Sequence, residues 1–137
     1  MIKIIDDGED KLAYITLSSK FARKSYPIDY NALTDSINTF MEREQRFRQA
    51  THTHHNHLKV NIEEVIGTVV DVDLESNMVV LELNDYGLKF LYDLQKQKGY
   101  DSDSIYIGPR CIGIHDTDTC TFKINTVLCF DLVKRWL

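Results

Sequence analysis

Four histidines lie within six residues of the chain, at His52, His54, His55 and His57. Imidazole is the side chain that most readily accepts and releases a proton near neutral pH, and it is also a common metal ligand. The segment is therefore suited to either acid–base catalysis or metal binding. Because it has no apolar periodicity, we expect residues 50–58 to form a loop or an edge strand rather than a packed element.

A metal site would depend on the alternation of side chains along an extended strand. In that conformation His52 and His54 share one face, and His57 or His115 would complete the site. Imidazole ligands suit zinc, nickel or copper. No cysteine or carboxylate lies within the run at a recognised ligand spacing, so we favour a solvated loop over a specific metal site, and we expect no cofactor.

A histidine base requires a nucleophile, and three residues of the later chain are candidates. Ser102 and Ser104 lie in an acidic stretch that is typical of a loop, whereas Cys111 precedes two isoleucines at alternating positions. A cysteine close to a protonated histidine is reactive as its thiolate. In a strand, however, Cys111 would alternate with Ile112 and Ile114, where a buried cysteine behaves as a small apolar residue. We therefore favour a structural role for Cys111.

Two amphipathic helices are predicted to position these residues. Apolar side chains recur every three or four residues from Asp29 to about Arg48, and again from Asn84 or Asp85 to Gly99. Asp29 and Asn84 are suitable N-caps, and Gly99 is the residue best able to end a helix in the left-handed conformation.

Strands predominate in the rest of the chain, where β-branched and aromatic runs are flanked by turn residues. Hairpins are predicted over residues 3–17 and 65–83, and single strands over residues 105–107, 111–114 and 127–133. We expect a single α+β domain over residues 1–137, with a small curled sheet or barrel of six or seven strands and two flanking helices.

The overall charge of −5 opposes broad electrostatic binding of nucleic acid, which requires a positive face. The clearest basic stretch contains Arg43, Arg46 and Arg48. Glu42 and Glu44 precede the latter two arginines by four residues, so we predict ion pairs on a solvated helix face.

The cysteines indicate a reducing compartment. Cys111, Cys120 and Cys129 are odd in number, form no CxxC pair and follow no signal peptide. No apolar stretch approaches the roughly 20 residues that a membrane-spanning helix requires. We therefore expect a cytoplasmic protein with no membrane association.

A series of motifs runs through residues 20–133 in a recognisable order. It comprises Tyr26-Pro27, a helix, the histidines, Val60-Asn61-Ile62-Glu63-Glu64-Val65, a hairpin and helix, Ile107-Gly108-Pro109-Arg110-Cys111-Ile112-Gly113 and Phe130-Asp131-Leu132-Val133. Together these motifs resemble the prohead proteases of tailed phages. Those proteins are capsid-maturation serine proteases related in fold to herpesvirus assemblin, so the resemblance implies an assemblin-like fold.

The resemblance also implies catalytic positions. The family histidine corresponds to His54, six positions before Val60, with His55 as the neighbouring choice. The nucleophilic serine corresponds to Gly108, whereas Arg110 matches the family turn. Because glycine has no side chain, nothing at position 108 can attack a scissile carbonyl.

Pro109 is a second departure from the family pattern. Main-chain N–H groups beside the nucleophile bind the developing oxyanion in such proteases, and proline removes one of these donors. The resemblance therefore implies a retained structural corner between strands that has lost its nucleophile and part of its oxyanion hole.

These observations favour a catalytically inactive protein of capsid or head assembly, which binds phage capsid or scaffold proteins in the host cytoplasm or the prohead. Self-association is expected because the family works in assemblies. Two alternatives remain open. One is an active serine or cysteine endopeptidase that uses His54 or His55 with Ser102, Ser104 or Cys111, and the other is a metal-binding regulator.

Overall fold

The computed structural model describes residues 1–18, 30–54, 58–118 and 121–134. Its elements form a mixed α+β domain with a single seven-stranded sheet. They are, in order, β1 (Ile2–Asp6), β2 (Lys11–Thr16), α1 (Tyr30–Met41), β3 (Gln49–Thr51), β4 (Val65–Asp73), β5 (Met78–Leu83), α2 (Asp85–Gln95), β6 (Ile105–Asp116) and β7 (Thr121–Lys134). Short 3-10 helices lie at 45–47, 62–64 and 102–104.

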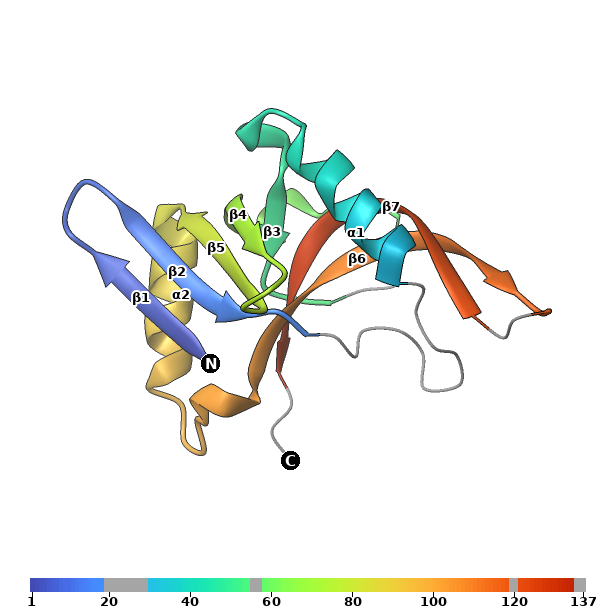
Figure 1. Cartoon of the computed structure of the whole chain (residues 1–137). Coiled ribbons are helices and arrows are strands. Elements are labelled where there is room, and N and C mark those ends of the chain that lie inside the picture. The colour runs from blue at the N-terminus through green and yellow to red at the C-terminus, as the bar shows by residue number, and fades with distance from the viewer. Residues whose placement is uncertain (19–29, 55–57, 119–120, 135–137) are drawn as a thin grey trace.

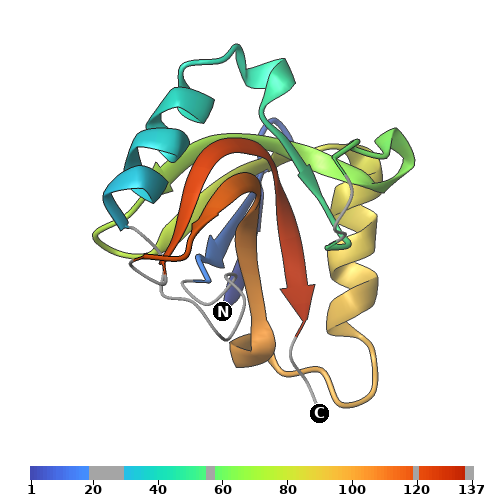
Figure 2. The same ribbon diagram turned by 90° about the vertical axis from the view of Figure 1, so that its right-hand side faces the viewer.

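The sheet is strongly curled but is not closed into a barrel (Figures 1 and 2). Its strand order is β1-β2-β5-β4-β3-β7-β6, and every pair is antiparallel except β3 with β7. Leu17, just beyond β2, forms one isolated parallel bridge with Ile107 of β6. A closed barrel requires a continuous ladder between its first and last strands. The expected barrel is therefore wrong, whereas the strand number and the two helices agree with the prediction.

The two helices cover different parts of the sheet (Figure 2). Helix α1 packs on β7, where Ser36 Oγ donates to the Ile124 carbonyl at 3.2 Å. Just after the helix, Arg43 Nη2 donates to the Val127 carbonyl at 3.0 Å. Helix α2 packs beside β4 and β5. The core between these layers is apolar, and Phe40 of α1 contacts Phe130 of β7 with ring centroids 5.3 Å apart. None of the helices in the described ranges has the length and apolar character needed to cross a membrane.

Helix α1 ends at Met41, seven residues before the predicted end. The reason is Arg48, whose Nη1 donates to the carbonyls of Met41 and Arg43, both at 3.0 Å, and whose Nε donates to the Val69 carbonyl at 2.9 Å. A guanidinium can satisfy the carbonyls that a helix leaves without partners at its C-terminus. The predicted ion pair of Arg48 on a solvated face is therefore wrong.

The expected corner around residues 107–113 is also wrong, because Ile105–Asp116 forms one continuous strand. Pro109 lies within it, paired in register with Phe130 of β7. Proline lacks a ladder donor and is tolerated within sheets mainly at edge strands, and β6 is the terminal strand of this sheet. The Gly108-Pro109 pair, which was interpreted as a corner, therefore lies within an edge strand in this fold.

Helix α2 begins as predicted, with Asn84 as its N-cap. The Asn84 side chain accepts from Gly87 N at 2.6 Å and donates to the Val65 carbonyl at 3.0 Å, which fixes the helix against β4. A Cβ atom at Gly87 would lie 1.9 Å from the Ile66 carbonyl oxygen. Glycine is therefore required for this close approach.

Replacing Gly87 with alanine tests this packing. In an isolated helix the change stabilises by about 1 kcal/mol. Here the clash with the β4 backbone should reverse the sign and lower the free energy of unfolding in urea by about 1–3 kcal/mol. As a matched control, Lys89→Ala on the exposed side of α2 should change it by less than about 0.5 kcal/mol. A Gly87→Ala protein as stable as the wild type would contradict the described approach of α2 to β4.

Candidate functional site

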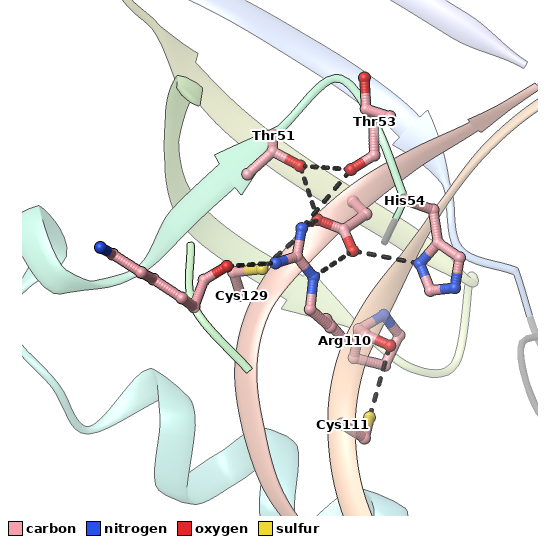
Figure 3. Close-up of polar contacts among 9 residues, drawn as sticks. Thr51, Thr53, His54, Arg110, Cys111 and Cys129 are labelled. Carbon is pink, nitrogen blue, oxygen red and sulfur yellow. Dashed lines mark hydrogen bonds and ion pairs between the residues drawn. The ribbon is translucent and has the colours of Figure 1, made fainter. Parts of the chain in front are cut away.

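Asp131 of β7 is the centre of a buried polar cluster. Its partners Thr51, Arg110 and Cys129 are labelled in Figure 3. Its side chain has no exposed surface, yet it carries a carboxylate. Arg110 Nε donates to Oδ2 at 2.8 Å and Nη2 donates to Oδ1 at 2.9 Å, so the guanidinium binds both oxygens. Bidentate pairs of this kind are among the strongest hydrogen-bonded contacts in proteins. The charge of Asp131 is thus compensated within the protein interior.

Two further residues donate to the same carboxylate. The Thr51 hydroxyl lies 2.6 Å from Oδ1 and 3.0 Å from the Thr53 carbonyl, and its single hydrogen is best used in the shorter contact with the charged oxygen. The Cys129 thiol lies 3.3 Å from Oδ1. Burial, followed by the negative charge of Asp131, raises the pKa of Cys129, so this residue remains a neutral thiol.

Arg110 joins this cluster to a loop outside the sheet. Its side chain is only 4% exposed, and Nη1 donates to the Lys59 carbonyl at 3.1 Å. Burial would lower the pKa of Arg110, but its contacts with Asp131 outweigh this effect and raise the pKa. The arginine that the sequence singled out is therefore a permanently charged structural link.

Strand pairing explains why these residues meet. Thr51, at the end of β3, pairs in parallel with Asp131, while Gly108 of β6 pairs with Asp131 from the other side. Directly opposed residues in antiparallel strands point to the same face of a sheet. Arg110, two residues after Gly108, therefore lies on the face of the Asp131 carboxylate.

His54 lies at the solvent-exposed rim of the cluster. Its Nδ1 is 3.1 Å from Asp131 Oδ2, and 44% of its side-chain surface is exposed. In the neutral ring this contact requires the proton on Nδ1, which leaves Nε2 unprotonated. This is the orientation of a general base held by a carboxylate. Of the two histidines that the resemblance implies, His54 is thus placed beside a carboxylate, and His55 lies outside the described residues.

The candidate nucleophiles do not complete this arrangement. The Cys111 thiol donates to the Pro109 carbonyl at 3.4 Å, and burial and the Asp131 charge raise its pKa to about 12. Ser102 accepts from Ile2 N at 3.2 Å, and the Ser104 hydroxyl donates to Asp101 at 3.0 Å. Both serines precede β6, and its rise of about 3.3 Å per residue separates Ser104 from Arg110 by roughly 20 Å along the strand.

His52 belongs to a different cluster. Its Nε2 lies 2.9 Å from the Tyr86 hydroxyl, and its ring stacks on Phe90 of α2 at 4.4 Å. His52 and His54 thus contact separate partners, while His57, one of the two predicted third ligands, lies outside the described residues. Within the ranges that the structure describes, no group of three or more His, Cys, Asp or Glu residues is arranged to hold a metal ion.

Sequence reasoning did not assign a role to Asp131, Thr51 or Cys129. One signal for Asp131 was available, because it begins the Asp-Leu-Val motif of the resemblance. Thr51 has no such signal, since its role depends on the parallel pairing of a three-residue strand with β7. Local patterns cannot predict such a pairing.

Comparisons with known proteins were negative in all three respects: no family model, no curated protein and no solved structure matches the chain.

Removing one partner of the buried ion pair should be strongly destabilising. We expect Arg110→Met to lower the free energy of unfolding by about 3–5 kcal/mol, because it leaves the Asp131 carboxylate buried without its cation. Adding Asp131→Leu should recover part of this loss in a double-mutant cycle measured by urea unfolding. Arg46→Met is the matched control, because the Arg46–Glu44 pair is about 70% exposed on both sides and should contribute under about 1 kcal/mol. Additive effects of the two core substitutions would refute coupling between Arg110 and Asp131.

The raised thiol pKa values predict slow alkylation of the folded protein. In a Cys120→Ser background, only Cys111 and Cys129 remain. Because the thiolate is the nucleophile and the pKa of Cys111 is about 12, we expect negligible modification by iodoacetamide at about pH 8 and an increasing rate as the pH rises. Mass spectrometry provides the readout, and the urea-unfolded protein, in which both thiols should react, is the control. Rapid labelling of folded Cys111 at about pH 8 would identify an activated cysteine instead.

Proposed function

We propose that this protein is a phage capsid or head-assembly factor with a prohead-protease-like, assemblin-related fold, and that it acts by protein binding rather than by hydrolysis. The observation that carries this proposal is the His54–Asp131 contact beside a glycine. Gly108 is directly opposite Asp131 in the strand register. A histidine in contact with a carboxylate thus lies beside the position at which the resemblance expects a serine.

The surroundings of Asp131 further support a structural role for the His54–Asp131 pair. Its two oxygens accept from Arg110, Thr51 and Cys129 in addition to His54. A carboxylate that compensates a buried guanidinium has less negative charge available to stabilise a protonated histidine. The same contacts instead tie β3, β6 and β7 into one rigid unit.

The surface next to His54 is suited to protein contact. The loop over residues 58–64 is joined to the site by the Arg110 contact to the Lys59 carbonyl and by the His52 N–H, which donates to the Glu64 carbonyl at 3.0 Å. Leu58 and Ile62 in this loop are 70% and 77% exposed. A contiguous exposed apolar surface is typical of protein-interaction sites. We therefore propose this loop as the surface that binds a capsid or scaffold protein.

An active endopeptidase is the alternative from the enzyme class, and the base-like orientation of His54 favours it. It would require a nucleophile that lies outside the described residues, or a rearrangement on substrate binding that brings a serine or cysteine side chain to His54. A metal-binding regulator is the third hypothesis, for which stoichiometric zinc after purification without a histidine tag would be the supporting result.

Incubation with tailed-phage capsid and scaffold proteins tests the proposal. We expect at least one of these proteins to co-purify with the chain and to remain uncleaved, as measured by pull-down and mass spectrometry. Leu58→Glu with Ile62→Glu should weaken the capture at least about tenfold, because two exposed apolar side chains lose their contact area. Ile112→Glu with Ile114→Glu, which changes two exposed side chains on β6, is the matched control and should preserve capture.

His54→Ala separates the two leading hypotheses. A binding protein should produce no fragments before or after this substitution. Fragments that appear with the wild type and disappear with His54→Ala would establish an endopeptidase and reject the inactive form. Failure to capture any capsid or scaffold protein would reject the binding role.

A further inference from the structure

The second half of β6 has an outer edge with no strand beside it among the described residues. Strand β6 ends the sheet, with β7 on its inner side. On the outer side, the described contacts are at the beginning of the strand, where Leu17 bridges Ile107 and Ser18 N donates to the Ile107 carbonyl at 2.8 Å. The distal parts of β6 and β7 project from the rest of the sheet (Figure 1). We call residues 111–114 the β6 edge.

Two large apolar side chains are exposed on the β6 edge. Ile112 is 39% exposed and Ile114 is 62% exposed. Being two residues apart in a strand, they lie on the same face. Ile124 and Val127 of β7, which pair with Gly113 and Cys111, are instead buried, at 3% and 1% exposed. The apolar face of the β6 edge is thus distinct from the buried face.

The β6 edge is also regular and uncharged. The register with β7 shifts twice, between Arg110 and Cys111 and between Ile112 and Gly113. In both cases β7 contains the additional residue, so the bulges distort β7 while β6 continues evenly. Natural edge strands are usually protected from pairing by charged side chains, proline or bulges on the edge itself. The four residues Cys111, Ile112, Gly113 and Ile114 contain none of these.

We propose that the β6 edge pairs antiparallel with the β6 edge of a second copy of this chain, about a two-fold axis at Gly113. In such a pair, residue numbers on opposite strands sum to a constant. An axis at Gly113 therefore places Ile112 directly opposite Ile114 of the other copy, and does so twice. Directly opposed residues lie on the same face with Cβ atoms about 5 Å apart, so all four isoleucines form one apolar cluster.

The symmetry of this pattern favours a second copy over a different partner. A closed two-fold interface requires one surface patch to be complementary to itself. An isoleucine on each side of a central glycine meets this requirement, because both side chains find an equivalent partner in the same register. The absence of charge along the β6 edge also lets two chains of net charge −5 approach there without facing like charges. This proposal does not depend on the proposed function.

Sedimentation velocity of the full chain over roughly a hundredfold range of concentration tests the proposal, since dimerisation follows mass action. We expect the wild type to change from its 15.9 kDa monomer to a dimer as concentration rises. The I112E/I114E variant should raise the dissociation constant at least about tenfold, because it places four carboxylates in the paired edge. Both side chains are exposed, and a far-UV circular dichroism spectrum equal to that of the wild type would verify that the variant folds.

Ile62→Glu provides the matched control, because Ile62 is 77% exposed but lies in the loop over residues 58–64. This variant should dimerise like the wild type. A second variant, Ile112→Cys with Ile114→Cys, should form an intermolecular disulfide under mild oxidation, since the proposed register opposes these two positions. A wild type that stays monomeric at all concentrations, an I112E/I114E protein that still dimerises, or dissociation by Ile62→Glu would each overturn the proposal.

Discussion

The organisation of this fold depends on the neutralisation of one buried carboxylate. Asp131 has no solvent contact, and an isolated charge in that position would be prohibitively costly. It is compensated by the guanidinium of Arg110 and by the hydroxyl of Thr51. Those donors lie on β6 and β3, the two neighbours of β7. The cost of burying one charge therefore specifies which strands flank β7 and in which register.

The same contacts limit the chemistry of the site. His54 reaches Asp131 at the exposed end of the cluster, in an orientation suited to a general base. A carboxylate that already accepts a bidentate guanidinium is, however, primarily a structural acceptor. The thiols nearby are kept protonated by burial and by the negative charge of Asp131. The cluster is thus better suited to holding a rigid surface for contacts than to forming a covalent intermediate.

The predictions from local pattern were confirmed where the pattern is itself the physical cause. Both hairpins form where β-branched residues flank turn residues, and Asn84 caps α2 because its side chain reaches an N–H three residues later. The predictions were wrong where contacts between residues distant in the sequence determine the local structure. Arg48 ends α1 through contacts that include β4, and the Gly108-Pro109 pair lies within an edge strand instead of a corner. Closure of the barrel was wrong because it depends on how far the whole sheet curls.

The sequence by itself determined the α+β class, the two amphipathic helices and the likeness in motif order that draws attention to His54, Gly108 and Arg110, because periodicity and capping act over a few residues. Only the tertiary structure decided that Asp131 is the partner of both Arg110 and His54. These contacts span 21 and 77 residues of sequence. Contacts over such distances arise from the order and register of strands in the sheet, which a local pattern does not encode.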